Sequence, residues 1–270
     1  MNESHGGMMV KSTVFFVLFC VLATGPFPDE MDWETYTLKA SANDQITAFD
    51  LLKKEFNALQ YDRDMLIMDF LQSNVQLSNQ ITSLLLDYRI LKQNYLTDGS
   101  IEYVYHLTLR NKILAHLLPK ASSVKLVVPM LCPCCGQEWP AGRAVPQGLE
   151  LVPEQIESTM YTGIVIDCRG FNLKPCLFPK IYNEMMEEVY SVSFADQNSI
   201  IDRGLVLYTT RDLLNNQRIG QNPLLIQAID IVGEARTDIE ISGPDARRIH
   251  GSKNNIELLR ECRFAIIFGP

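Results

Sequence analysis

The sequence contains few of the residues and motifs that usually carry catalysis or nucleic-acid binding. Its 270 residues include only 4 histidines, and no G-x-S-x-G elbow, H-E-x-x-H helix or Walker phosphate loop is present. The 24 basic residues are outnumbered by 32 acidic ones, and no basic cluster interrupts the net charge of −8. A nucleic-acid partner would require a surface that neutralises phosphates. The sequence therefore predicts neither an enzyme nor a nucleic-acid-binding protein.

The sequence also lacks an apolar run long enough to cross a membrane near its N-terminus. The run from Val14 to Ala23 falls short of the ~20 residues that span a bilayer. A basic flank, a short apolar core and small residues at its end are typical of a secretory signal peptide; a buried core helix is the alternative. We predict a signal peptide over residues 1–23 and a periplasmic location. Phe19 is too large to precede a lipidated Cys20, so we expect peripheral association with the outer membrane at most.

Cysteine is too sparse to build a disulfide scaffold. The chain has 7 cysteines, and Cys20 would leave with the signal peptide. Hydrophobic residues make up 47% of the chain, so a hydrophobic core can supply the stability. The remaining length suits two ordinary domains, and export favours disulfides over free thiols.

Glycine and proline are absent from residues 41–98, yet a single coiled coil is not expected there, because the heptad register places polar residues in the seam. We predict instead an α+β domain over residues 30–118. Its strongest feature is the alternation of apolar and polar residues in "IEYVYHLTL", which predicts a strand with His106 on the solvated face. The expected elements are a strand at 34–40, a helix at 43–60 capped by Asn43 or Asp44, a strand at 65–70, a helix at 73–86, and strands at 88–96 and 101–109 joined through Asp98-Gly99.

The second half of the chain divides at a segment rich in proline and cysteine. Residues 119–158 contain six prolines, which prevent a long helix or central strand. A mixed-sheet domain is predicted for residues 159–270. The fold class is thus α+β, with two small mixed α/β-sheet domains joined by this segment. Expected strands lie at 161–167, 187–192, 204–209, 237–242 and 263–268, and expected helices lie before Gly204, after Thr210, at 222–233 with Asn222 as N-cap, and at 242–251 with Ser242 as N-cap.

Two stretches of the sequence resemble known envelope proteins. The segment "LQSNVQLSNQITSLLLDYRILKQNYLTDGSIEYVYHLTL" resembles the small outer-membrane lipoprotein family that includes the flagellar assembly protein FlgP, and is similar to the N-terminal domain of FlgT. The C-terminal half resembles an extension of envelope proteins of the same group, with matching "IGQNPLLIQA" and "ISGPDARRI" segments. Its motif residues are Tyr161, Thr162, Gly163, Asp167, Arg169, Gly170, Lys174 and Pro175.

The resemblance spans roughly residues 30–270 and implies an architectural role around the flagellar basal body for flagellar members. For the other members it implies no particular activity. The chain departs from the pattern at Cys168 and Cys176, where such relatives tend to carry alanine. It also departs in its N-terminus, since many relatives are lipoproteins. This departure weighs against stable anchoring in the outer membrane.

The polar pair Asp167 and Arg169 ends an apolar strand, and their spacing points both side chains to one face. Two interpretations fit. The pair is a ligand clamp in which Arg169 holds a carboxylate or phosphate, or it is an ion pair that fixes the following loop. The ion pair is the favoured interpretation.

Two sets of cysteines are candidate disulfides. Cys168 and Cys176 flank a loop short enough to fold back on itself, and a bridge there would contribute about 2–3 kcal/mol under the chain-entropy model; two inert buried thiols are the alternative. Cys132 and Cys135 form a C-x-x-C knuckle followed by glycine, which also suits zinc. No second C-x-x-C is present, so a zinc site would have to recruit Cys134 or distant sulfurs. A disulfide of Cys132 with Cys135 or with Cys262 is favoured over zinc at the knuckle, and the absence of both is the remaining alternative.

We therefore expect an exported structural or assembly component of the bacterial cell envelope, associated with the flagellum, that acts by protein–protein contacts. Its expected partners are envelope or flagellar basal-body proteins, with a homo-oligomer as a further option and no nucleic acid. No cofactor is expected apart from the open alternative of zinc. The competing hypothesis is a periplasmic ligand- or zinc-binding module, and a hydrolytic enzyme is the third.

Overall fold

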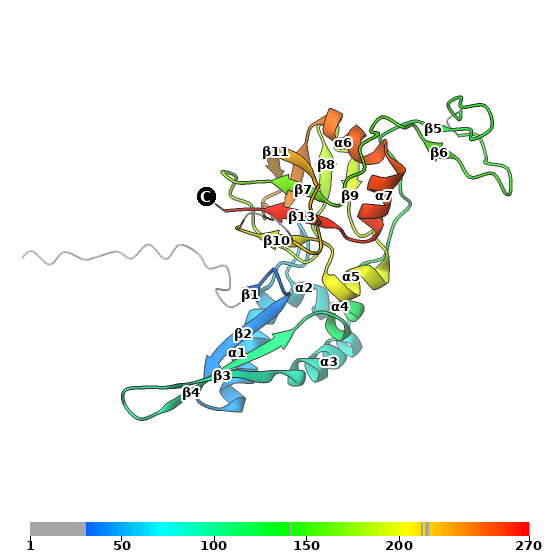
Figure 1. Ribbon diagram of the computed structural model, residues 1–270. Coiled ribbons are helices and arrows are strands. Elements are labelled where there is room, and N and C mark those ends of the chain that lie inside the picture. The colour runs from blue at the N-terminus through cyan, green and yellow to red at the C-terminus, as the bar shows by residue number, and fades with distance from the viewer. Residues whose placement is uncertain (1–30, 141, 212, 214–215, 270) are drawn as a thin grey trace, which may run out of the picture.

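The computed structural model describes residues 31–140, 142–211, 213 and 216–269, so the predicted signal peptide lies outside the described residues. A four-stranded sheet organises the N-terminal part and a seven-stranded sheet the C-terminal part, with helices beside both (Figure 1). The described chain thus combines helices with β-sheets, and the predicted α+β class is confirmed. In the described ranges, no helix combines the length and the apolar character needed to cross a bilayer.

The first sheet is antiparallel and packs one face against helix α1 (Gln45–Ala58). Asp44 starts this helix, because its side chain accepts two backbone N–H groups of the first turn. Leu52 and Phe56, one turn apart, are fully buried beneath it. The helix predicted at 43–60 is therefore confirmed. The strand order is β1-β2-β4-β3, with β1 at Met31–Asp32, β2 at Thr37–Ala42, β3 at Arg89–Tyr95 and β4 at Ile101–Thr108.

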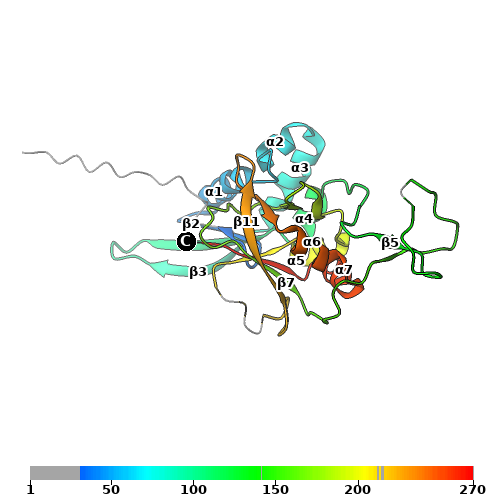
Figure 2. The ribbon, with the colours of Figure 1, turned by 90° about the horizontal axis from the view of Figure 1, so that it is seen from above.

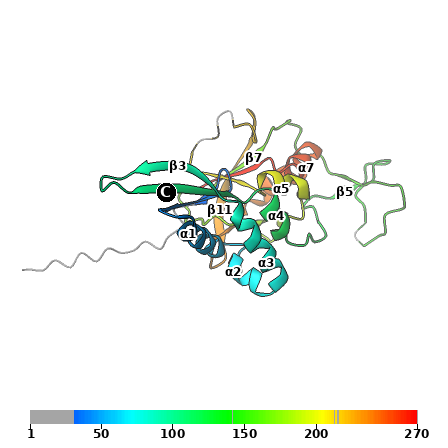
Figure 3. The same ribbon diagram turned by 90° about the horizontal axis from the view of Figure 1, so that it is seen from below.

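Strands β3 and β4 form the predicted hairpin, which extends from the body of the molecule (Figures 1 and 3). Gly99 has a φ of +87°, a conformation that glycine adopts without a steric penalty. Tyr105 and Leu107 of β4 are buried on the side of α1. His106 between them faces the other way, as the alternation predicts.

The strand predicted at 65–70 is wrong, because this segment begins helix α2 (Ile67–Gln72). A short apolar run does not distinguish a strand from a buried helix. Here the Asp69 carboxylate accepts the backbone N–H of Leu66 at 3.1 Å and so favours the helical start. Three further elements complete this part, namely α3 (Val75–Leu84), a 3₁₀ turn η1 (Leu85–Asp87) and α4 (Lys112–Leu117).

Residues 130–153 of the proline-rich segment form an arm that lies well outside the two sheets in all three ribbon views (Figures 1–3), while Val127 before the arm and Ile156 after it are hydrogen-bonded to the C-terminal half. Its only described strands are β5 (Met130–Leu131) and β6 (Val152–Pro153), which pair with each other. In Figures 2 and 3 the arm and the β3–β4 hairpin point to opposite ends of the molecule.

The second sheet is mixed, with the order β10-β13-β7-β11-β12-β8-β9. Its first four strands run parallel, and β11 pairs antiparallel with β12. Strand β8 and helix α7 were not expected from the sequence. The elements are β7 (Ile164–Asp167), β8 (Ile181–Asn183), β9 (Glu188–Tyr190), α5 (Gln197–Arg203), β10 (Leu207–Thr209), β11 (Leu224–Val232), β12 (Asp238–Ile241), α6 (Gly243–His250), α7 (Lys253–Arg260) and β13 (Phe264–Ile267).

The helix predicted at 222–233 is wrong, because this segment forms the central strand β11. Leu224 and Ile226 are buried while Leu225 between them is 68% exposed, a period of two that belongs to a strand. Strands β7 and β12 pair with both edges of β11, so its backbone hydrogen bonds go to its neighbours. The helix predicted at 242–251 is confirmed as α6, with Ser242 as its N-cap.

The two sheets share one continuous hydrophobic core. Tyr36, next to β2, is fully buried, and its hydroxyl donates to the carbonyl of Val206 at 2.8 Å. Tyr61 packs edge-on against Phe178 with ring centroids 5.0 Å apart. The backbone N–H of Phe178 also donates to the carbonyl of Tyr61 at 3.0 Å. Apolar packing and hydrogen bonds therefore hold the two halves of the chain together.

Candidate functional site

The cysteine knuckle lies on the arm, where the chain reverses direction after β5. The backbone N–H of Cys132 donates to the carbonyl of Gln137 at 2.9 Å, and that of Gly136 to the carbonyl of Cys132 at 2.8 Å. Gly136 has a φ of +71°, which the turn requires. The backbone N–H groups of Cys134 and Cys135 point at the Cys132 sulfur and hold the pKa of this thiol below its ordinary value. The turn predicted from the C-x-x-C-G spacing is thus present, while zinc binding at this turn stays a prediction.

The exposure of the cysteines separates the knuckle from the core. Cys134 and Cys135 are exposed, whereas Cys168, Cys176 and Cys262 are buried. Burial raises the pKa of each of these three thiols well above its ordinary value. All six cysteines that the structure describes are free thiols. The two predicted disulfides, one between Cys168 and Cys176 and one between Cys132 and Cys135, are not formed in this structure, and both stay predictions.

Asp167 and Arg169 form a bidentate ion pair at the end of β7. Nε of Arg169 lies 3.0 and 3.1 Å from the two carboxylate oxygens, and Nη2 lies 2.5 Å from Oδ2. The backbone N–H of Arg169 donates to the same carboxylate at 3.0 Å. The hydrogen bonds from the Arg169 side chain lower the pKa of Asp167. The ion pair is thus present, while the use of this pair as a ligand clamp stays a prediction.

This ion pair borders an open groove of about 770 Å³ on one face of the second sheet. The floor consists of side chains from the parallel strands, such as Val165, Leu225 and Ile267. The opposite face of these strands belongs to the main core, whereas the described residues of the groove face form a small separate apolar cluster. Sequence reasoning found the polar rim of this groove and missed its apolar floor.

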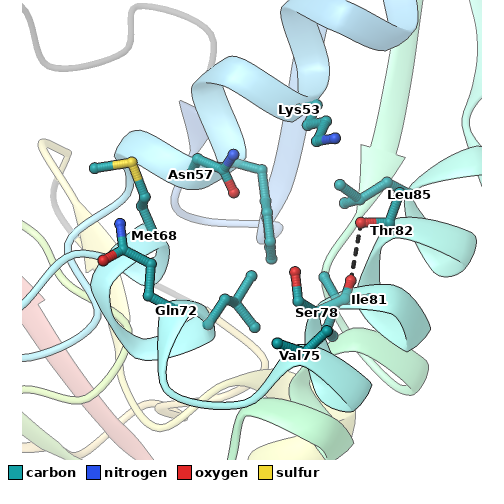
Figure 4. A pocket seen from close by; sticks show the side chains of 11 residues that line it. Lys53, Asn57, Met68, Gln72, Val75, Ser78, Ile81, Thr82 and Leu85 are labelled. Carbon is teal, nitrogen blue, oxygen red and sulfur yellow. Dashed lines mark hydrogen bonds between the residues drawn. The ribbon is translucent and has the colours of Figure 1, made fainter.

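A smaller pocket of about 230 Å³ lies among helices α1, α2 and α3 (Figure 4). Phe56 is among its lining residues, together with the half-exposed Met68 and the exposed Val75. The Thr82 hydroxyl already donates to the carbonyl of Ser78 at 2.8 Å, the bond drawn in Figure 4. One of the polar groups that line this pocket is thus already engaged.

A basic face on the first sheet was not anticipated from the sequence. Lys39, His106 and Arg89 lie in register across β2, β4 and β3, on the side away from α1. Lys92 is paired with Val104 and therefore shares that side. We call Lys39, Arg89, Lys92 and His106 the basic face. Asp32 and Glu102 lie on the same side of the sheet, and Asp32 forms an ion pair with Lys39 at 3.5 Å. Strands far apart in the sequence bring these residues together, so only the composition of β3, two basic and no acidic residues, hinted at it.

The edge of the sheet beside the basic face is also open. β3 is the last strand in its sheet and is exposed along almost its whole length. Leu91 is 57% and Tyr95 78% exposed. Edge strands of soluble proteins are usually short, charged or bulged, because open backbone groups invite another strand to pair. β3 has a bulge near Ile90 and Lys92, yet the stretch toward the hairpin tip pairs regularly with β4.

These features define an α+β protein with a shared core, a projecting hairpin and a cysteine-bearing arm. Residues 163–270 match a family model described as the second domain of Treponema pallidum Tp0624. The match covers less than half of the chain and marks the C-terminal sheet as similar to that domain. A search of the curated proteins gave no match. The resemblance to FlgP and FlgT stays a prediction.

Proposed function

We propose that this chain is a structural or assembly component of the bacterial cell envelope that acts in the periplasm by protein–protein contact. The observation that carries the proposal is the open edge of β3 (Arg89–Tyr95) beside the basic face. An extended segment of a partner pairs with such an edge through main-chain hydrogen bonds, and pockets for alternate side chains give specificity.

The charges of β3 indicate what kind of segment fits. β3 contains Arg89 and Lys92 and no acidic residue. Antiparallel pairing of β3 with a second copy, centred on Lys92, would place this lysine opposite itself, and like charges directly opposite each other destabilise a sheet. An acidic extended segment of a different envelope protein instead pairs favourably with both cations. Basal-body proteins are the first partners to test, because the resemblance to flagellar proteins implies them.

The test uses the full chain in a deletion strain of its host, with a photo-crosslinking amino acid at Gln93 on β3. We expect it to crosslink to one discrete envelope protein. Lys92→Glu should abolish this product, because the reversed charge repels an acidic strand. Lys54→Glu on α1 is the matched control, since Lys54 is exposed and lies on the helix that covers the other face.

Envelope fractionation, a swimming assay and imaging of basal bodies then test the flagellar assignment. Lost motility with a missing basal-body ring supports it. Normal motility together with a freely diffusing protein and no crosslinked product from β3 would overturn the proposal. A crosslink to a second copy alone would reject the acidic partner.

A second candidate function is the binding of a small molecule in the groove beside Asp167 and Arg169. The observation in its favour is the size, since about 770 Å³ lies within the range of ligand pockets. Native mass spectrometry of the purified chain tests it. A co-purified molecule that is lost in Leu225→Trp, which fills the floor of the groove, supports this function; no bound mass in the unaltered chain rejects it.

A further inference from the structure

A pocket of about 330 Å³ lies at the base of the hairpin, where β4 leads into α4 (Figure 1). Its described lining includes Arg89, Arg110 and Lys112, together with His106 and a single carboxylate, that of Asp87. With the imidazole counted as neutral, these groups leave a formal charge of +2 on the lining. A chain with a net charge of −8 thus gathers positive charge in one hollow of its surface.

The cations reach the pocket from separate elements. Arg89 on β3 lies directly opposite His106 on β4. Arg110 comes two residues after the end of β4, and Lys112 is the first residue of α4. The pocket is therefore a product of the fold, which brings together charges that are separated along the chain.

Arg110 is held in place by the body of the molecule. Its Nη2 donates to the carbonyl of Glu34 at 2.9 Å, and its guanidinium carbon lies 5.9 Å from the centroid of the Tyr36 ring. Its Nε is buried and has no hydrogen-bond partner among the described residues. Buried donors are nearly always paired, so this N–H calls for an acceptor from outside the described chain.

The two arginines of the pocket are not neutralised by the protein itself. Among the residues that the structure describes, no carboxylate lies within ion-pair distance of Arg89 or Arg110. Lys112 is paired, since its Nζ lies 2.6 Å from a carboxylate oxygen of Asp87. The side chains of this pair are 68% and 59% exposed, and such exposed pairs contribute little to stability, so a ligand can displace Asp87 at small cost.

We propose that this pocket binds the phosphate group of a small phosphomonoester. The planar guanidinium groups of Arg89 and Arg110 present forks of N–H donors that match phosphate oxygens, and Lys112 adds a further cation. A phosphomonoester has a charge of about −1.5 to −2 at pH 7, which balances the charge of the lining, whereas one carboxylate would balance half of it.

The size of the pocket and its apolar residues fit the remainder of such a molecule. About 330 Å³ lies at the small end of the range of ligand pockets. Leu84, Leu107 and Ile113 also line it and offer an apolar wall to the organic part of the ligand. A free phosphorylated compound and the headgroup of a phospholipid share this chemistry, so the test includes both.

The inference goes beyond the proposed function, because a phosphate site needs no partner strand. The test is a calorimetric titration of the purified full chain with glycerol 3-phosphate, so its result is independent of the crosslinking at Gln93. We expect one site per chain, competition by inorganic phosphate, and weaker binding as salt increases. Glycerol should not bind. Flotation with vesicles of phosphatidic acid, beside vesicles of phosphatidylcholine, then tests the lipid source.

Three single variants identify the ligand-binding groups. Arg110→Gln should weaken binding about tenfold to hundredfold, because it removes charged hydrogen bonds. Lys112→Gln should weaken it about twofold to fivefold, and Asp87→Asn should strengthen it by a similar factor, because the competing carboxylate is gone. Lys54→Gln is the matched control and should bind as the unaltered chain does, since Lys54 is exposed on α1 and does not line the pocket.

Urea unfolding checks that each variant folds. If Arg110→Gln is unfolded, Lys112→Gln and Asp87→Asn decide the outcome, because both positions are exposed. Binding only to phosphatidic acid vesicles would support the site and assign the phosphate to a lipid. Absence of binding in solution and to vesicles would overturn the inference, and so would equal affinity for acetate. Weaker or unchanged binding in Asp87→Asn, or full binding in a folded Arg110→Gln, would reject these residues as the site.

Discussion

The substitution Gly204→Ala tests whether the two halves of the molecule depend on one tightly packed contact. Gly204 follows α5 with φ +80° and ψ 160°, a region of backbone conformation that is essentially restricted to glycine. A Cβ atom at this position would overlap Cζ and Cε2 of the fully buried Tyr36 ring and lie 2.7 Å from its hydroxyl oxygen. Both the backbone and the neighbouring ring therefore oppose the substitution.

Two contributions add to its expected cost. The backbone conformation costs about 1–3 kcal/mol for a residue other than glycine, and overpacking against a buried ring costs about 1–3 kcal/mol more. We expect the free energy of unfolding to fall by about 2–6 kcal/mol in total. In urea the midpoint should fall by about 1–3 M, since the slope for a chain of this size is about 2–3 kcal/mol per molar.

A double-mutant cycle separates the two contributions. In a Tyr36→Leu background the clash is relieved, so that Gly204→Ala should cost only the backbone share, and the coupling should be about 1–3 kcal/mol. Gly170→Ala is the control for the backbone share alone, because Gly170 has a φ of +83° and no atom lies within 4 Å of the place that a Cβ would take there. A loss below about 1 kcal/mol for Gly204→Ala, or zero coupling with position 36, would refute this account of the interface.

Three further predictions concern buried polar groups and helix caps. Burial raises the pKa of Asp238 to about 6, so the folded state retains a proton between about pH 4 and 6. The free energy of unfolding therefore falls by up to about 3 kcal/mol as pH rises through this window. Asp238→Asn should remove this component from urea unfolding curves recorded across pH. Burial lowers the pKa of His250 to about 4. The contribution of the neutral imidazole to the free energy of unfolding is therefore complete above about pH 6.5 and is lost as pH falls toward about 4. An NMR titration midpoint above about 6 would contradict this prediction. Ser242→Ala should cost about 1 kcal/mol in urea unfolding, because it removes the side chain that caps the N-terminus of α6. Ser252→Ala at α7 should cost less, since the bond from the N–H of Asn255 to the Ser252 hydroxyl is 3.4 Å long. Equal losses would contradict this ranking of the two N-caps.

Much of the fold was predictable wherever a local interaction decides the structure. Asp44 and Ser242 cap helices through bonds to N–H groups two or three residues away. Asp98-Gly99 turns the β3–β4 hairpin, and the alternation in β4 identifies its buried face. These features depend on residues that are neighbours in the sequence, so their pattern is visible before the chain folds.

The two wrong elements lie where local signals conflict with tertiary contacts. Residues 222–233 begin with Asn-Pro, which resembles a helix start, but the pairing of β11 with β7 and β12 selects a strand. Residues 65–70 have a strand-like composition, but Ile67 and Leu71 are buried one helical turn apart. In both cases the surroundings supply more free energy than the local preference does.

The candidate sites divide in the same way. The cysteine knuckle and the Asp167–Arg169 ion pair each form within a few residues of chain, so both could be predicted before the fold was known. The tertiary structure was needed to find the basic face, which strand register assembles from three strands, and the groove, whose floor joins β7, β11 and β13. It also decided that His250 is a buried structural group, since its partners lie 61 and 123 residues away. The physical reason is that contacts at such separations depend on the register and packing of the whole chain, which no short pattern in the sequence specifies.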